Sequence, residues 1–276
     1  MKALFDQSGR VAVVTGAGSG LGLQAAACLA ELGATTFLLD LDEARLEEAC
    51  AGLRSKGLPV QSRVVDVCDA AQQGAVFDEI VAAHGRLDVV MANAGVSGGR
   101  GPMARAGAID AVDIAHWQQV LDINLTGTFK TLQCACRHMK TFKRGRIIAT
   151  TSASVLSPEP FVSYSYSASQ AALNATIRLL AVEMAAYGVS VNAIAPGPFV
   201  TGISGGAMAD PGVQQTLSKR IALGRLGAPE DIRGLVAFLA SDASSYLTGE
   251  VIALAGGYPS APLAATAVTP QPPRPQ

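Results

Sequence analysis

Short apolar runs alternate with longer amphipathic segments along most of this chain of 276 residues. The runs are rich in β-branched residues and almost continuously apolar, which is typical of strands covered on both faces. A repeated strand–helix–strand order predicts a doubly wound, parallel α/β sheet with right-handed crossovers. We expect seven strands, at 11–15, 35–40, 61–66, 87–93, 145–151, 189–195 and 250–254. Helices are expected near 21–32, 43–56, 69–84, 116–140, 164–187 and 229–241.

The pattern fits a single domain over residues 1–258. A chain of this length can bury one large core, and no segment looks like an interdomain linker. Residues 259–276 are rich in proline and poor in large apolar side chains, so they are predicted to form a disordered tail. The connection at 97–115 is long for a compact domain, and loops of that length are often functional.

Composition and charge argue against several classes of partner. A net charge of -1, with 49% hydrophobic residues, gives no reason to expect nucleic acid or an anionic membrane. The N-terminal MKALFDQSGR lacks the apolar run of a signal peptide, and no later segment offers about 18 uninterrupted apolar residues, so we expect a cytoplasmic protein. The five cysteines are interpreted as buried or idle thiols. Cys134 and Cys136 point in different directions on a helix, and His138 alone completes no metal site.

A glycine-rich turn, TGAGSGLG, runs from Thr15 to Gly22 between the first predicted strand and the first predicted helix. Glycines let the backbone approach a pyrophosphate, and a helix N-terminus offers free N–H groups and a partial positive charge. A tight turn alone would also explain the glycines. Their position between a strand and a helix favours a dinucleotide site.

Asp40 ends the second predicted strand, eighteen residues after Gly22. A carboxylate at this position can accept hydrogen bonds from an adenosine ribose, whereas it would repel a 2′-phosphate. Neither the glycine turn nor Leu41 supplies an Arg or Lys to offset that repulsion, so NAD(H) is favoured over NADP(H). The alternative role for Asp40 is a helix N-cap, which Asp42 could fill instead.

From about residue 8 to 258, the sequence resembles the short-chain dehydrogenase/reductase family, in the group with a TGxxxGxG turn. The resemblance implies a Rossmann-like fold and a nicotinamide cofactor. It also implies that Asn124, in LDINLTGTF, and Ser152, in IIATTSAS, are active-site residues. The cofactor residues, from the turn, Asp40 and the family motifs together, are Gly16, Ser19, Gly20, Leu21, Gly22, Asp40, Asp66, Val67, Asn93, Ala94, Gly95, Tyr166, Gln170, Pro196, Gly197, Phe199 and Thr201.

The stretch YSYSASQ departs from the family at one position. The family pattern is a tyrosine followed four residues later by a lysine, and here Gln170 follows Tyr166. Residues four apart share a helix face, so both side chains should point into one cleft. Tyr164 fits the pattern less well, because Ala168 lies four residues after it. It stays as the alternative acid/base and is otherwise expected to line the pocket.

The missing lysine matters because of what the resemblance implies for the mechanism. In the family, tyrosine exchanges a proton with the substrate oxygen, and the lysine binds the nicotinamide ribose and lowers the pKa of the tyrosine. Gln170 can still hydrogen-bond to the ribose but carries no charge. Arg178 is two further helical turns along and too far away to replace the lysine.

Three functions remain open at this point. The first is an NAD(H)-dependent oxidoreductase that interconverts a secondary alcohol and a ketone, impaired or unusual through Gln170. The second is a catalytically silent dinucleotide-binding protein, and the third is non-redox chemistry, such as dehydration, on the same scaffold. Retention of Asn124, Ser152 and Tyr166 favours the first.

The remaining expectations concern the substrate and the assembly. An apolar or cyclic small-molecule substrate is suggested by side chains before the catalytic helix, after Pro196-Gly197 and in the long loop. The resemblance further implies a homotetramer that pairs through the helices near 116–140 and 164–187. The apolar side chains are Phe161, Val162, Phe199, Ile203, Met208 and Met103.

Overall fold

The computed structural model describes residues 2–156 and 159–258, and the predicted tail lies outside the described residues. Its centre is a seven-stranded parallel sheet in the order β3-β2-β1-β4-β5-β6-β7, which confirms the doubly wound architecture. Each strand falls within three residues of its predicted bounds at either end. The strands are β1 (Val11–Thr15), β2 (Thr35–Asp40), β3 (Val60–Val64), β4 (Val89–Ala92), β5 (Gly145–Thr150), β6 (Val189–Pro196) and β7 (Val251–Leu254).

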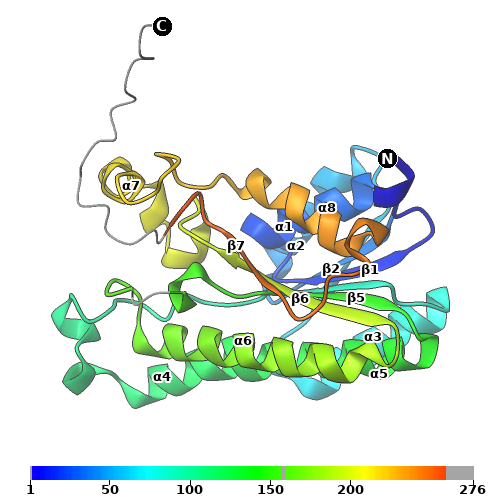
Figure 1. Cartoon of the computed structure of the whole chain (residues 1–276), viewed down its shortest axis with the longest axis horizontal. Helices are drawn as coiled ribbons and strands as arrows, with labels where there is room; N and C mark the ends of the chain where they lie inside the picture. The colour runs from blue at the N-terminus through cyan, green and yellow to red at the C-terminus, as the bar shows by residue number, and fades with distance from the viewer. Residues whose placement is uncertain (1, 157–158, 259–276) are drawn as a thin grey trace, which may run out of the picture.

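Helices cover both faces of the sheet (Figure 1). On one face lie α1 (Gly20–Glu31), α2 (Glu43–Arg54) and α8 (Arg233–Ala240). On the other lie α3 (Ala70–His84), α5 (Thr128–Phe142) and α6 (Tyr164–Ala185), with α4 (Ile114–Leu121) packed beside α6.

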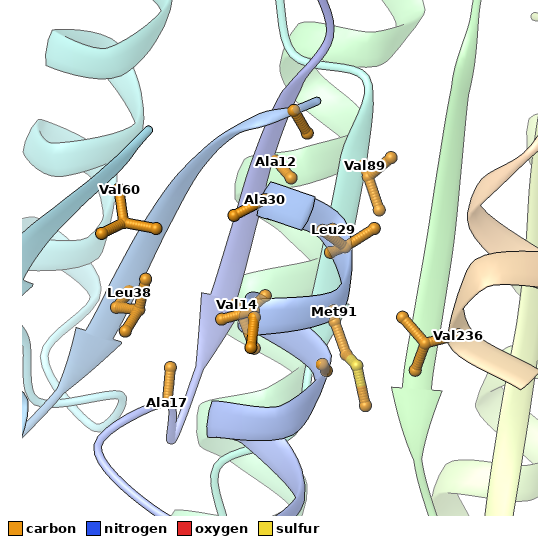
Figure 2. Packing of buried hydrophobic residues seen from close by; sticks show 14 of the residues in the cluster. Ala12, Val14, Ala17, Leu29, Ala30, Leu38, Val60, Val89, Met91 and Val236 are labelled. Carbon is orange, nitrogen blue, oxygen red and sulfur yellow. The ribbon is translucent and has the colours of Figure 1, made fainter. Parts of the chain in front are cut away.

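The two faces of the sheet belong to two separate apolar clusters, because successive side chains of a strand point to opposite sides. Val14 and Leu38 face α1, as Figure 2 shows, together with Leu29 of that helix. Val13 and Phe37, one residue earlier on the same strands, belong to the cluster under α3, α5 and α6. Burial on both faces is why these strands lack polar alternation and could be recognised in the sequence.

The helix predicted at 116–140 is not continuous. A π-helical turn, η4 (Asp122–Gly127), separates α4 from α5. Inside it, the Asn124 amide accepts a hydrogen bond from Val96 N (2.8 Å) and donates one to Val96 O (2.9 Å). This pair of bonds ties the turn to the loop after β4, and π turns of this kind occur often at functional sites.

The predicted functional loop at 97–115 contains two short 3₁₀ turns and is joined to the segment before α6. Arg100 forms an isolated antiparallel bridge with Val162, and Gly101 N donates to Phe161 O over 3.1 Å. A Cβ at Gly101 would lie 2.5 Å from Pro160 O, so only glycine permits this approach. The loop therefore fixes the backbone that carries Phe161 and Val162.

Helix α7 (Pro211–Ser218) was not predicted from the sequence. Its start carries a readable signal, because the Asp210 side chain caps the N-terminus and Pro211 occupies the first turn. Among the described residues, no helix is both long enough and apolar enough to cross a bilayer.

Candidate active site

A cavity of about 1400 Å³ opens at the carboxyl ends of β1, β2, β4, β5 and β6. The sheet order reverses between β1 and β4, and ligands of open parallel sheets bind in the crevice at such a switch point. Most of the predicted site residues meet there. The lining includes every predicted cofactor residue except Gly22 and Gln170, and it includes Ser152 and Tyr166 but not Asn124.

The glycine turn is packed too tightly for side chains. Gly16 and Gly20 have left-handed backbones, with φ of 64° and 55°. A Cβ at Gly22 would lie 2.2 Å from Gly16 O, so this glycine keeps α1 close to the turn rather than lining the cavity. Ser19 precedes α1 without a side-chain capping bond, which leaves the first amides of the helix free for an anion.

Asp40 presents its carboxylate to the cavity beside the glycine turn. Its oxygens accept hydrogen bonds from Gly18 N (2.9 Å) and Asp42 N (3.1 Å). Asp42, as the alternative reading allowed, caps α2 by accepting from Arg45 N. Arg45 also lines the cavity. It lies in the first turn of α2 rather than directly after Asp40, so the sequence pattern did not point to this cation.

Asn93 joins the ends of three strands. Its side-chain amide donates to Thr15 O (3.1 Å) and Gly16 O (3.3 Å), and its oxygen accepts from Thr150 Oγ1 (2.9 Å). Asp66 accepts from Cys68 N over 2.7 Å, which shapes the loop after β3. These bonds hold the rim of the cavity at the central strands.

Tyr166 and Ser152 meet inside the cavity, where Tyr166 comes from α6 and Ser152 from the end of β5. Desolvation raises the pKa of the Tyr166 phenol above its ordinary value of 10.0, and a hydrogen bond with the Ser152 side chain opposes that rise. Neither cause is a cation. Ser152 Oγ also accepts from Ser154 Oγ over 2.9 Å, and Ser154 is a lining residue that the sequence analysis missed.

Gln170 lies one turn after Tyr166 on α6, but its side chain is packed into the protein. It is 5% exposed, is not among the described residues that line the cavity, and its Oε1 has no hydrogen-bond partner. A buried carbonyl without a donor is energetically costly, so Gln170 Oε1 is an unsatisfied acceptor one helical turn after Tyr166. The shared cleft expected for Tyr166 and Gln170 is therefore not seen in this conformation.

Two other expectations about the lining are wrong. Tyr164 is not among the lining residues and is partly exposed, because residues two apart on a helix point in different directions. Met103 is 70% exposed, since the pairing of its loop with 160–162 turns its side chain outward. The other five apolar side chains expected at the substrate end do line the cavity. Leu217, Tyr258 and Glu159 join them there, from segments that the sequence patterns gave no reason to combine.

Of the five cysteines, Cys68 lines the cavity in the loop after β3, and the other four do not. All five are free thiols, and burial raises the pKa of Cys136 to about 11, which makes it a poor nucleophile. Within the described part of the chain, no three His, Cys, Asp or Glu side chains gather as metal ligands.

A dinucleotide fits the residues that are present. Gly16 and Gly20 line the cavity and carry no side chains that would keep a pyrophosphate from the backbone, and the free amides of α1 suit such a group. Asp40 offers a carboxylate to ribose hydroxyls, whereas the buried Gln170 does not line the cavity.

Known proteins resemble this chain in both sequence and fold. A family model described as enoyl-(acyl carrier protein) reductase matches residues 16–259. Cis-4-hydroxycyclohexanecarboxylate dehydrogenase of Sinomonas cyclohexanicum is 38% identical, over 90% of this chain and 96% of its own. The human dehydrogenase/reductase SDR family member 4 is 32% identical, over 91% and 88% of the two chains.

A solved structure is similar to this chain in fold as well as in sequence. The gluconate 5-dehydrogenase from Burkholderia cenocepacia, crystallised with NADP and tartrate, has a TM-score of 0.86 and 32% identity, covering 94% of this chain and 99% of its own. Sequence, fold and the cavity at the switch point thus agree, and the chain belongs to the short-chain dehydrogenase/reductase family.

Proposed function

We propose that this protein is an NAD(H)-dependent oxidoreductase that interconverts a secondary alcohol and a ketone. The observation that carries the proposal is the pairing of Tyr166 with Ser152 between the glycine turn and the apolar end of the cavity. A phenol held by a hydroxyl in this way can bind a substrate oxygen and exchange a proton with it.

The chain supplies proton transfer and positioning in this reaction. Tyr166 donates its proton to the substrate oxygen during reduction or accepts one during oxidation, while Ser152 holds that oxygen in place. Asn124 acts indirectly, because its two bonds to Val96 fix the loop that forms one wall. When bound, the nicotinamide cofactor supplies or accepts the hydride.

The choice of NAD(H) rests on Asp40. Its carboxylate would face the 2′-position of the adenosine ribose, where a phosphate would add a second negative group. Arg45 lines the same region and weakens this preference, but its guanidinium is engaged with Asp42 at 3.2 Å. A family relative was crystallised with NADP, so the family as a whole does not decide the matter.

We further propose an apolar or cyclic substrate and a cytoplasmic homotetramer. Phe161, Phe199 and Met208 provide an apolar surface at the substrate end, and one relative is named for a hydroxycyclohexanecarboxylate, a cyclic alcohol that also carries a carboxylate. The experiment is a panel of cyclic secondary alcohols with NAD⁺, followed by NADH absorbance between pH 7 and 10. Tyr166→Phe is the matched control, and it should abolish turnover.

A catalytically silent, dinucleotide-binding role is the second candidate. The raised pKa of Tyr166, with no cation beside it, favours this role. The same experiment separates the candidates. NADH binding without turnover of any alcohol supports the silent role, and conversion of substrate without net NADH change supports non-redox chemistry.

A further inference from the structure

Glu159 places a carboxylate in the wall of an otherwise apolar substrate end. It lies in the segment before α6, its side chain is only 5% exposed, and it lines the cavity together with Phe161, Met208 and Leu217. The other charged lining residues lie on the cofactor side, near the glycine turn and the loop after β3. They are Asp40, Asp42, Arg45, Asp66 and Asp122.

Two side chains that are distant in sequence, Arg220 and Tyr258, hold this carboxylate. Arg220 Nη1 donates to Oε1 over 3.2 Å, and Nη2 donates to Oε2 over 3.0 Å, in a bidentate pair. The hydroxyl of Tyr258 donates to Oε2 as well. Glu159 is thus held by two chain segments far from its own in sequence, one after α7 and one after β7.

The guanidinium of Arg220 is committed to this pair. It lies 5.4 Å from the ring centre of Phe161 and 5.2 Å from that of Tyr258, so both rings pack against it. Arg220 itself is not among the described residues that line the cavity, whereas Glu159, Phe161 and Tyr258 are. A substrate at this end of the cavity therefore meets the carboxylate rather than the cation.

We propose that Glu159 is a specificity-determining residue that makes this cavity select neutral alcohols and reject alcohols carrying a carboxylate. This inference rests on the proposed function. A substrate carboxylate beside Glu159 would leave two negative groups competing for one guanidinium, and Glu159 is itself almost fully removed from solvent. Specificity of this kind arises from a repulsive element as well as from apolar contacts.

The test compares two ring alcohols of the same shape, 4-hydroxycyclohexanecarboxamide and 4-hydroxycyclohexanecarboxylate, with NAD⁺. For the wild-type protein, kcat/KM should be at least about tenfold higher for the carboxamide, which corresponds to about 1.4 kcal/mol. Equal values would overturn the proposal. A preference for the carboxylate would also overturn it and would point to Arg220 as an anion receptor.

Two variants should shift this ratio in opposite directions. Glu159→Gln removes the negative charge and frees Arg220, so the preference should fall about tenfold or reverse. Arg220→Met leaves Glu159 uncompensated, so the preference should sharpen. Glu79→Gln is the matched control, because Glu79 pairs with Arg63 at 2.6 Å outside the cavity and its loss should leave the ratio unchanged. A ratio that stays constant in both test variants contradicts the proposal.

Binding separates this proposal from the proposed function. Calorimetry on the protein saturated with NADH measures cyclohexanecarboxamide against cyclohexanecarboxylate without requiring turnover. Weaker binding of the carboxylate that Glu159→Gln relieves supports the charge selection, even if no alcohol is oxidised and the proposed activity fails. Equal binding of the two compounds overturns the charge selection and leaves the activity to be judged from turnover.

Discussion

Desolvation of the Tyr166 phenol stabilises its neutral form, because a phenolate needs water or a nearby cation. Gln170 supplies no charge, so oxidation by this protein should be slow at neutral pH and rise as the phenol ionises. We expect the alkaline limb of kcat/KM for alcohol oxidation to lie above the ordinary tyrosine value of about 10. A pH–rate profile of the wild-type protein measures it.

The substitution Gln170→Lys should lower the pKa of Tyr166 and speed alcohol oxidation at neutral pH. A cation about 5 Å from the phenolate contributes about 3 kcal/mol at an effective dielectric near 20. If most of that is expressed in the transition state, turnover at pH 7 should rise roughly a hundredfold, and the alkaline limb should move toward neutrality. Steady-state kinetics with one alcohol across the pH range tests both effects.

The control for this substitution is Tyr166→Phe combined with Gln170→Lys, which should lose nearly all of the gain. Tyr164→Phe in the same background should keep it, since Tyr164 does not line the cavity. An unchanged rate and pH profile in Gln170→Lys would mean that Tyr166 is not tuned from this position.

Cofactor preference can be tested at Asp40. The wild-type protein should bind NADH at least about tenfold more tightly than NADPH, because a carboxylate facing a phosphate costs about 1.4 kcal/mol or more. Asp40→Ser should remove that difference, since it takes away the repelling carboxylate and leaves Arg45 in the same part of the lining. Asp40→Ser with Arg45→Gln should not gain NADPH affinity. Dissociation constants by calorimetry measure all three proteins.

These residues also show how far a sequence can predict a site. Tyr166, Ser152 and Asp40 could be placed because each stands at a fixed distance from a strand end or within a motif. The orientation of Gln170 could not, because which way a polar side chain turns depends on packing across α6. Glu159 could not either, since its partners Arg220 and Tyr258 lie 61 and 99 residues away.

Among the elements, α1 and its glycine turn make a sharp test of packing. Gly22→Ala would place a methyl group 2.2 Å from a backbone oxygen, which cannot move aside as a flexible side chain can. We expect a loss of about 1–3 kcal/mol in the free energy of unfolding, together with weaker NADH binding. Denaturant melts and NADH fluorescence titration measure the two effects.

Gly74→Ala is the matched control in α3, where a Cβ meets nothing within 4 Å. Alanine there should stabilise the protein by about 0.5–1 kcal/mol and leave NADH binding unchanged, because glycine is a poor helix former. Loss of NADH binding in both variants would show that the effect of Gly22 is not local to the turn.

The boundaries of the helices were harder to predict than those of the strands. The helical pattern of apolar residues runs almost without a break from 116 to 140, so the sequence does not predict the π turn η4. That turn depends on the bonds of Asn124 to Val96, which are contacts between segments. The start of α7 could have been predicted, because Asp210 and Pro211 form a local signal for a helix N-terminus.

At the scale of the whole molecule, the outer face of α6 is left unusually apolar. Leu179 and Val182 are 75% and 77% exposed and lie three residues apart, on one side of the helix. Phe129 on α5 is also exposed. Neighbouring exposed apolar side chains such as Leu179 and Val182 commonly mark an interface, and homo-oligomers close by pairing such surfaces.

We expect the homotetramer that the family resemblance implies, with subunits that pair through α5 and α6. Leu179→Glu combined with Val182→Glu should dissociate it, because each pairing would bury uncompensated carboxylates from both subunits. Val64→Glu, on the exposed edge strand β3, is the control and should leave the assembly intact. Light scattering of the wild-type protein at micromolar concentration should give about four times the 28.2 kDa of one chain. A wild-type mass near that of one chain would contradict the assembly. An assembly that stays intact in the double variant would contradict this interface, because Leu179 and Val182 would then lie outside the contacts between subunits.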